Sequence, residues 1–294
     1  LPFGHNGGNL DRKKVLDWFG SVAKLDCDKV FHNASYDIGW LRTLGITVNG
    51  KVHDTMISSA LIDENRMSYS LNSLAKEKLG RSKSETQLTT AAKAFGVDPK
   101  KEMYKLPSMH VGEYAEYDAR LTYDLYLLNK EEIDKQDLHD IYDLETRLQP
   151  CLIDMRAQGV RVDLGAANKA KTLLTEREEE AMHEIKNLCG LDIEIWAAAS
   201  IAKAFDKLGI PYKRTEKTDA PSFTKNFLDT HEHPLAKHIV EARVLNKANT
   251  TFIDTILRHQ YKGRIHSEVH QMRSDDGGTV TGRFSYSNPN LQQI

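Results

Sequence analysis

The sequence has few cysteines and no long apolar run, and each of these absences excludes a class of protein. Its three cysteines, Cys27, Cys151 and Cys189, lie far apart and lack the paired spacing of a zinc site. We therefore interpret them as reduced thiols of a cytoplasmic protein, not as a disulfide framework. The chain contains no stretch of about 18 apolar residues, and it does not open with a basic segment followed by an apolar one. The sequence therefore predicts neither a membrane span nor a secretion signal.

The composition is that of a globular protein, with 40% hydrophobic and 28% charged residues among 294. This length predicts about two domains. Charge is distributed unevenly, because residues 1–150 carry 20 Lys and Arg against 23 Asp and Glu, whereas residues 201–264 carry 12 against 7. A basic stretch after a slightly acidic half is compatible with gripping a polyanion with one part and holding metal cations with the other. Ordinary surface charge remains an equally open reading of the same counts.

Short apolar segments alternate with amphipathic ones in residues 1–150, which predicts an α/β architecture. Strands are expected at 29–32 and 51–54, and helices at 10–22, 36–44, 55–61, 71–79 and 87–95. The glycines Gly45, Gly80 and Gly96 follow three of these helices as C-terminal caps. From 111 to about 158 the pattern stays helical, and Pro150 is expected to kink or break that helix.

The second half is predicted to be mainly helical until it reaches a β-hairpin. Asp163 is suited to cap a long helix that runs to about 188, and Pro234 suits the first turn of another that runs to about 257. Shorter elements are expected at 160–163 (strand or turn), 200–208 and 222–228 (helices). Strand patterns at 264–272 and 279–285 flank an Asp/Gly cluster at 275–278, which predicts the hairpin.

Two short groups of residues suggest hydrolytic chemistry. Asn33, Tyr36 and Asp37 stand where a predicted strand meets a helix, and ligands of α/β sheets usually bind at strand ends. Tyr114 and Asp118 are four residues apart, on one helical face. A carboxylate can hold Mg²⁺ or Mn²⁺ while a phenol orients the attacking water. Taken singly, Asp37 is better explained as a helix cap and the Tyr/Asp pair as a surface feature.

Taken together, these groups carry a resemblance. Asn33-x-x-Tyr36-Asp37, followed about 80 residues later by Tyr114-x-x-x-Asp118, resembles the second and third motifs of the proofreading 3′–5′ exonucleases, which have an RNase H-like fold. The resemblance implies that Asp37 and Asp118 are ligands of a two-metal Mg²⁺ or Mn²⁺ site. It implies that Tyr114 positions the water, and that Asn33 and Tyr36 support the site and the bound 3′ end of single-stranded DNA.

The first motif of that family, Asp-x-Glu, is not found before Asn33. Asp26-Cys-Asp28 lies too close to Asn33 to serve, and Leu1-Pro-Phe3 resembles the third strand of the family sheet. Asp54-Thr-Met56 resembles the Asp-Thr that follows a sheet strand in these enzymes. We therefore expect a chain that starts after the first motif, lacks two of four carboxylates and holds metal poorly.

The second half resembles family A DNA polymerases, the bacterial polymerase I and phage type. The Thr279-Val-Thr-Gly-Arg283 to Pro289-Asn-Leu-Gln-Gln-Ile294 stretch resembles the opening of the palm and is the most specific signal, and Ser274-Asp-Asp-Gly-Gly278 resembles phage members. The remaining similar segments are 144–150 and 155–163 (entry into the polymerase region), 213–215 and 222–224 (thumb tip), 233–235 and 241–247 (long thumb helix), and 263–266 (palm).

The resemblance implies DNA contacts in the segments that resemble the thumb and in those that resemble the start of the palm. Arg283 is expected to donate to the primer-terminal base from the minor groove, where every base pair presents an acceptor. Asn290 and Gln292 are expected to contact the duplex nearby, and Thr281 to hold the loop. The cations expected to neutralise phosphates are Lys213, Arg214, Arg243 and Lys247. The alternative for Arg243 and Lys247 is that they simply lie on a solvent-exposed face of the helix and bind no phosphate.

The expected architecture is an α/β RNase H-like exonuclease domain, N-terminally truncated, followed by a mainly α thumb and the first β-hairpin of a palm. The expected boundaries are 1–143 (exonuclease), 144–163 (connection), 164–262 (thumb) and 263–294 (start of palm). Expected partners are primer–template DNA, a single-stranded 3′ end and, in a complete polymerase, dNTPs; we expect a monomer. The family's palm carboxylates and fingers helix are not in the sequence, so this chain alone is expected to be inactive as a polymerase and, without the first exonuclease motif, a poor or inactive nuclease.

Two alternatives remain from the sequence. One is a stand-alone 3′–5′ exonuclease of the ribonuclease D type, which would have no use for residues 213–294. The other is a non-catalytic DNA-binding protein or one subunit of a split polymerase.

Overall fold

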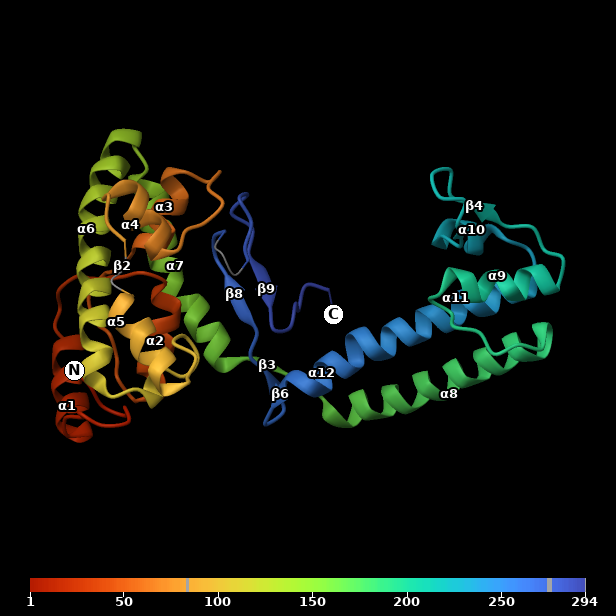
Figure 1. The fold of residues 1–294 in the computed structure, drawn as a ribbon, viewed down its shortest axis with the longest axis horizontal. Helices are drawn as coiled ribbons and strands as arrows, with labels where there is room; N and C mark the ends of the chain where they lie inside the picture. The colour runs from red at the N-terminus through yellow and green to blue at the C-terminus, as the bar shows by residue number, and fades with distance from the viewer. Residues whose placement is uncertain (83–84, 274–276, 294) are drawn as a thin grey trace. The chain divides into compact units, whose positions relative to one another are not determined.

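The computed structural model describes residues 1–82, 85–273 and 277–293, which form two compact units (Figure 1). The first unit contains Leu1–Gln158 and Ser267–Gln292, and the second contains Gly159–His266 and Gln293. The predicted boundary at 143/144 falls inside a helix, and the residues from Ser267 onward, predicted to begin a palm, pack with the first unit.

Two short parallel strands and a set of helices make up the first unit. The strands β1 (Lys29–Phe31) and β2 (Val52–Asp54) pair so that Phe31 lies opposite Asp54. The helices are α1 (Arg12–Ala23), α2 (Ala34–Thr43), α3 (Thr55–Ile62), α4 (Leu71–Lys78), α5 (Thr86–Phe95), α6 (Gly112–Gln136) and α7 (His139–Gln158), with the 3₁₀ turns η1 (Met103–Lys105) and η2 (Ser108–His110). The predicted α/β alternation is thus confirmed, but residues 1–3 form no strand, so that part of the prediction is wrong.

Local chemistry accounts for most of these element ends. Asp11 accepts a hydrogen bond from the Lys14 amide and begins α1, and the Ser70 hydroxyl caps α4 in the same way. At the C-terminal ends, Gly80 and Gly96 both have φ of 65°, a left-handed conformation that glycine adopts without the steric cost of a Cβ. Gly45, with φ of 74°, ends α2 in the same way, so the three predicted glycine caps are confirmed.

The long helical stretch breaks at a place the sequence did not predict. Asp137, with φ of 54°, ends α6, and α7 begins two residues later and continues through Pro150. Short polar side chains tolerate the left-handed conformation. Pro150 costs α7 a backbone hydrogen bond, but the helix is held by tertiary packing against α2, α3 and β2. The prediction that Pro150 marks the break is therefore wrong.

Three buried apolar clusters hold the first unit together. One joins α2, β2 and α7, one joins α3, α4 and α6, and one joins α5 to the start of α6. Their most buried large side chains are Tyr69, Leu74, Leu106, Leu121 and Leu125. The first and second clusters fix α2 and α6 to the rest of the unit, and these two helices carry the predicted carboxylates.

The second unit is built on two long helices that lie side by side, α8 (Leu164–Cys189) and α11 (Pro234–Lys247) (Figure 1). The Asp163 carboxylate accepts from the Ala166 amide and caps α8, as predicted. A π-helical segment at Ala248–Ile253 continues α11 into α12 (Asp254–His259), close to the predicted end of that helix. The core contains Ile201, Phe205, Leu235 and Ile239, all fully buried.

Smaller elements complete the second unit. The helices α9 (Ala198–Lys207) and α10 (Lys225–Thr230) lie near the two-stranded pair β4 (Lys213–Arg214) and β5 (Pro221–Ser222), and a three-stranded antiparallel sheet has the order β3 (Val160–Arg161), β7 (Arg264–Ile265), β6 (Gln260–Tyr261). The helix predicted at 222–228 begins only at Lys225, because the Thr224 hydroxyl caps it.

The predicted hairpin near the end of the chain exists with different strands. β8 (Glu268–His270) pairs antiparallel with β9 (Ser285–Ser287), with Val269 opposite Tyr286. Residues 279–284, predicted as strand, instead form a turn in which the Thr279 hydroxyl donates to the Arg283 carbonyl at 2.8 Å. Residues 274–276 of the predicted Asp/Gly turn lie outside the described residues. Within the described part of the chain, no helix is both long and apolar enough to cross a membrane.

Candidate active site

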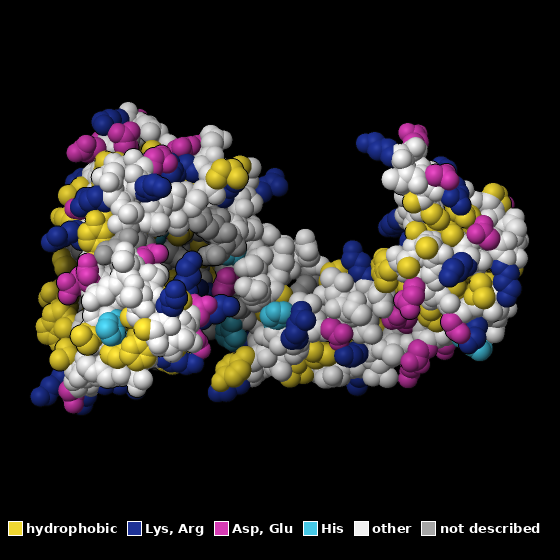
Figure 2. Space-filling model, in the orientation of Figure 1, with side chains coloured by type: hydrophobic (Ala, Val, Ile, Leu, Met, Phe, Trp, Pro, Cys, Tyr) yellow, Lys and Arg dark blue, Asp and Glu magenta, His cyan; other side chains and the backbone are white. Residues whose placement is uncertain are grey.

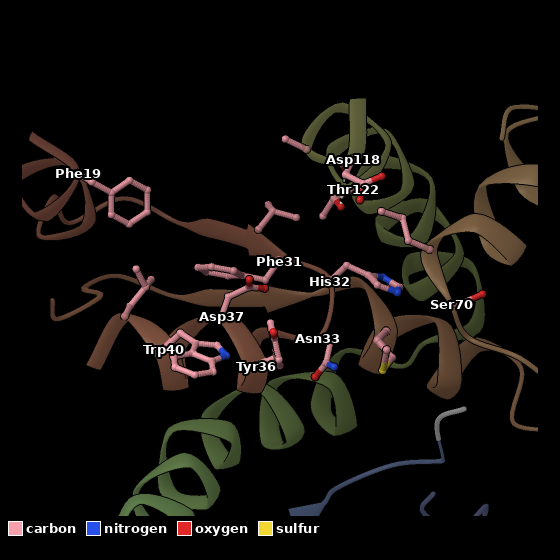
Figure 3. A pocket seen from close by; sticks show the side chains of 15 residues that line it. Phe19, Phe31, His32, Asn33, Tyr36, Asp37, Trp40, Ser70, Asp118 and Thr122 are labelled. Atoms are coloured by element: carbon pink, nitrogen blue, oxygen red, sulfur yellow. Dashed lines mark hydrogen bonds between the residues drawn. The ribbon is translucent and has the colours of Figure 1, made fainter. Parts of the chain in front are cut away.

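A pocket of about 770 Å³ opens in the first unit beside the end of β1. Asp37 from α2 and Asp118 from α6 both line it, so the structure brings together the carboxylates of the two sequence motifs. Figure 3 shows Asp37 close to Phe31 and Trp40 on one side, with Asp118 and Thr122 on the other. Asn33 and Tyr36 line the same pocket.

The turn between β1 and α2 positions the first motif. Asn33 adopts a left-handed conformation there, with φ of 68° and ψ of 57°. The carboxylate of Asp54, at the end of the neighbouring strand, accepts hydrogen bonds from the backbone amides of Asn33 (3.0 Å) and Ala34 (2.8 Å). This carboxylate therefore holds the first turn of α2, and Asp37 follows on that helix.

Asp54 is itself fixed from two further directions. It caps α3 by accepting from the Met56 amide at 2.9 Å, and it accepts from the Gln149 side chain of α7 at 2.6 Å. Asp54 is only 4% exposed to solvent. Four donors on one buried carboxylate satisfy its charge, and they join β1, β2, α3 and α7 at the base of the site.

Asp37 has a raised pKa, and the charge of Asp54 contributes to it. Burial in the pocket wall, followed by the negative charge of Asp54, raises the pKa of the Asp37 carboxyl to about 6. A carboxylate whose charged form is disfavoured by desolvation and by a neighbouring anion gains from a bound cation. Asn33 and not Asp37 occupies the N-cap position of α2, so the alternative that Asp37 caps this helix is wrong.

The two pocket carboxylates set a limit on metal binding. Among the residues that the structure describes, no group of three or more His, Cys, Asp or Glu side chains is arranged to hold a metal ion. Mg²⁺ is commonly bound by one or two protein carboxylates together with waters and substrate phosphates. Asp37 and Asp118 are thus the pocket carboxylates that could hold such an ion together with a substrate phosphate.

Tyr114 does not lie where the sequence predicted. It is half-buried against the apolar cluster that includes Leu88, Ala92 and Leu106, and it is not among the residues that line the pocket. Its spacing of one turn from Asp118 is as expected, but Tyr114 packs against the cluster formed by α5, Leu106 and Val111. In this conformation Tyr114 stabilises the start of α6 and does not reach the pocket.

Several pocket residues were missed by the sequence reasoning. His32 precedes Asn33, and its Nδ1 lies 2.8 Å from the Thr55 hydroxyl. Thr122 stands one turn after Asp118 and donates to the Asp118 carbonyl at 2.8 Å. Trp40 stands one turn after Tyr36. Helical spacing from the motif residues could have indicated Thr122 and Trp40, whereas Phe19 of α1 had no motif to indicate it.

The predicted phosphate contacts lie in the second unit, and one of them needs correction. Arg243 donates from Nε to the Ile195 carbonyl (2.7 Å) and from Nη1 to the Phe223 carbonyl (3.0 Å). Its guanidinium lies 5.2 Å from the centre of the Trp196 ring, and burial lowers its pKa. Arg243 thus fastens two loops to α11, and we remove it from the phosphate contacts.

The other predicted cations are exposed. Lys213 and Arg214 lie on β4, and Lys247 lies at the end of α11. Arg214 donates to the carbonyl of Asp219, at 2.6 Å, within the same hairpin. On the visible face of the second unit, basic and acidic side chains are interspersed (Figure 2). The basic balance of residues 201–264 therefore does not form a continuous basic band on that face.

The segments on either side of β9 use some of their predicted DNA-binding side chains internally. The Gln292 side chain donates to the Phe284 carbonyl at 3.0 Å, and the Asn290 side chain accepts from the Gln292 amide at 3.1 Å. The Thr281 hydroxyl lies 3.2 Å from that of Thr279. Arg283 is exposed in the segment that precedes β9. The arrangement leaves Arg283 as the side chain best placed to reach a partner.

Comparison with known proteins identifies the family. Residues 165–294 match the family model described as DNA polymerase family A, and residues 20–132, which include both carboxylate motifs, match the model described as 3′–5′ exonuclease. The chain belongs to DNA polymerase family A. The match to the polymerase model also disfavours a stand-alone exonuclease.

Relatives within family A come from phages and bacteria. The chain is 36% identical to a DNA-directed DNA polymerase of Pseudomonas phage M6, over 100% of the chain and 46% of that protein. It is 27% identical to DNA polymerase I of Synechocystis sp., over 99% of the chain and 29% of that protein. The chain thus spans about half the length of the phage relative.

A solved structure supports the fold. The polymerase domain of Pol1 from M. smegmatis, in complex with DNA primer-template and dNTP, superposes with a TM-score of 0.73 at 22% sequence identity. The similarity covers 97% of this chain and 46% of that one. At this identity the comparison supports the fold alone.

Proposed function

We propose that this family A chain serves template-directed DNA synthesis with proofreading, and that the pocket of the first unit is its 3′–5′ exonuclease site. The observation that carries the proposal is that Asp37 and Asp118, from motifs about 80 residues apart, line one pocket within the region that matches the exonuclease model. The parallel pair β1–β2 with its surrounding helices supports an RNase H-like fold for this unit.

The residues of the pocket would divide the work of hydrolysis. Asp37 and Asp118 would hold Mg²⁺ or Mn²⁺, which when bound lowers the pKa of water and polarises a phosphoryl oxygen. Asp54 keeps the turn before α2 in place, so that Asp37 faces the pocket without reorganisation. Tyr36, exposed at the rim, would contact the 3′ end of the strand.

The second unit and the β8–β9 loop would hold primer–template DNA. Lys213, Arg214 and Lys247 would neutralise phosphates without reading sequence, and Arg283 would donate to an acceptor in the minor groove. Asn290 and Gln292 would shape the loop that presents Arg283. The division into exonuclease, connection, thumb and start of palm stays part of this proposal, as do dNTP binding by the whole polymerase and a monomeric state.

The decisive experiment is degradation of 5′-labelled single-stranded DNA in Mg²⁺. We expect slow shortening from the 3′ end, because the printed sequence has no Asp-x-Glu before Asn33, and faster shortening when such a segment is joined upstream. Asp118→Asn should reduce both rates to background. Glu116→Gln, an exposed change two residues away on α6, is the control. Equal activity of the two variants, or shortening from the 5′ end, would contradict the proposal.

A further inference from the structure

A small cavity lies within the first unit, between α2, β2 and α7. Its volume is about 90 Å³, and its walls combine apolar side chains with three polar residues, Arg42, Thr47 and Gln149. Among the described residues, none lines both this cavity and the candidate exonuclease pocket. The proposed hydrolysis therefore gives the cavity no task.

The side-chain amide of Gln149 has its orientation fixed by Asp54. Its Nε2 donates to the Asp54 carboxylate at 2.6 Å. The opposite orientation would set the amide oxygen against that carboxylate, where two acceptors would face each other. Asp54 does not line the cavity and Gln149 does, so Oε1 is the polar atom of Gln149 that is left for the cavity.

This oxygen is buried without a donor from the protein. Gln149 is only 2% exposed, and no group in the described part of the chain donates a hydrogen bond to its Oε1. Pro150, which also lines the cavity, has no backbone N–H to offer. A buried amide oxygen that lacks a hydrogen bond is costly, and in native structures such atoms are normally satisfied by the protein or by ordered water.

The lining decides which kind of ligand fits. The Gln149 oxygen accepts, the Arg42 guanidinium donates, and the Thr47 hydroxyl can do both. A cation would meet the charge of Arg42, which already pairs with Asp154, and an anion would meet the Gln149 oxygen. A neutral molecule that both donates and accepts suits all three groups. Water needs about 10–15 Å³ and two to four polar partners, and the cavity provides both.

We propose that this cavity binds ordered water, and that one water molecule donates to Gln149 Oε1 while it accepts from the Thr47 hydroxyl or the Arg42 guanidinium. The water holds the Gln149 amide in the orientation in which it donates to Asp54. It therefore supports, from behind, the carboxylate that fixes the turn before α2. The inference does not depend on the hydrolytic assignment, because it rests on the buried oxygen and the cavity alone.

Filling the cavity tests the inference, because a wet cavity and a dry one respond with opposite sign. Val48→Ile combined with Val52→Ile adds two carbon atoms to the cavity walls. If water is bound, these atoms displace it and leave the Gln149 oxygen unpaired. The equilibrium constant for unfolding of the first unit should then rise about tenfold, measured by urea unfolding of the whole chain. A dry cavity would instead gain stability on filling, and that result would overturn the inference.

Overpacking also lowers stability, so the same pair of changes is made in a Gln149→Met background. Methionine has nearly the shape of glutamine but no amide oxygen, so displacing the water there leaves no acceptor unpaired. In this background the two changes should be neutral or stabilising. An equal cost in both backgrounds would mean that the added atoms strain the walls, and the water would have to be given up.

A high-resolution crystal structure of the unchanged chain shows the water directly. We expect a density peak about 2.7–3.2 Å from Gln149 Oε1, within reach of Thr47 or Arg42. The peak should be absent from the chain that carries Val48→Ile and Val52→Ile. A side chain that donates directly to Oε1, with no peak in the cavity, would contradict the inference.

Discussion

At the scale of single residues, the candidate site depends on a side chain that does not line it. Asp54 accepts four hydrogen bonds, from the amides of Asn33, Ala34 and Met56 and from the Gln149 side chain. Its charge is thereby satisfied at a buried position, and, after the larger effect of burial, this charge also raises the pKa of Asp37. A single carboxylate thus fixes the turn and sets part of the electrostatics of the site.

Replacing that carboxylate tests the arrangement. Asp54→Asn keeps the shape but turns an N–H group toward donors, so at least one amide loses its acceptor. We expect the free energy of unfolding of the first unit to fall by about 2–4 kcal/mol, since hydrogen bonds to a charged group contribute about 1.5–3 kcal/mol each. Urea unfolding followed by circular dichroism measures this change.

The control for that measurement is Asp17→Asn on α1, which removes only an exposed pair with Lys13. It should leave the unfolding midpoint where it is. Similar midpoints for the two variants would mean that the turn at Asn33 holds without Asp54.

The sequence predicted residues of the pocket well where a short motif defines them. It predicted the role of a side chain poorly where that role depends on contacts with residues far away along the chain. Asp37 and Asp118 reach one pocket because each sits at a motif position on its own helix. Arg243 was misassigned because its acceptors, Ile195 and Phe223, come from loops 48 and 20 residues away along the chain. Tyr114 has the expected spacing, but packing against α5 decides where its ring goes.

At the scale of elements, α7 joins the candidate site to the hairpin β8–β9. Gln149 on this helix bonds Asp54, and one turn earlier both the carbonyl and the carboxylate of Glu145 accept from the Gln271 side chain. Gln271 follows β8 directly. All four residues are buried, between 2% and 9% exposed. Polar groups at such depth are costly when unpaired, so they fix one register of α7 against both partners.

Removing the Gln271 donor should therefore destabilise the hairpin. Gln271→Leu leaves the buried Glu145 carboxylate without this hydrogen bond, and we expect a loss of about 2–4 kcal/mol in the free energy of unfolding. In the same variant, the amide hydrogens of Glu268–His270 and Ser285–Ser287 should exchange faster.

A second variant distinguishes pairing from packing. Glu145→Leu combined with Gln271→Leu replaces both polar partners by apolar groups, which is often nearly neutral. The double variant should therefore be more stable than Gln271→Leu alone. If the single and the double variant have the same free energy of unfolding, the effect comes from altered packing around position 271.

Elements with strong end signals were predicted closely from the sequence. The helix that begins after Asp163 and ends before Gly190 is the clearest case, because a carboxylate cap and a glycine with φ of 64° define it locally. The break at Asp137 and the passage of α7 through Pro150 were not predictable, because packing against α2, α3 and β2 outweighs the local preference of proline. The hairpin was predicted, but its second strand was displaced to Ser285–Ser287 because Thr279 and Arg283 close a turn first.

At the scale of the whole molecule, the two units have separate apolar cores. The core around Phe205 lies entirely within residues 181–242, whereas the clusters around α2, α4 and α5 belong to the first unit. The proposed duplex contacts divide between the units, with Lys213, Arg214 and Lys247 in the second and Arg283 in the first. The proposed duplex contacts should therefore be tested on the whole chain and not on either unit alone.

The salt dependence of that binding tests the proposed phosphate contacts. Binding of primer–template DNA should weaken as salt rises, with a log–log slope of about −0.9 per phosphate neutralised. Lys213→Ala should weaken binding to all sequences alike and flatten the slope by about one unit, since one counterion-releasing contact is lost. Lys130→Ala, an exposed lysine on α6 of the first unit, is the control and should leave the slope unchanged. If both variants keep the original slope, Lys213 touches no phosphate, and the basic balance of residues 201–264 is ordinary surface charge.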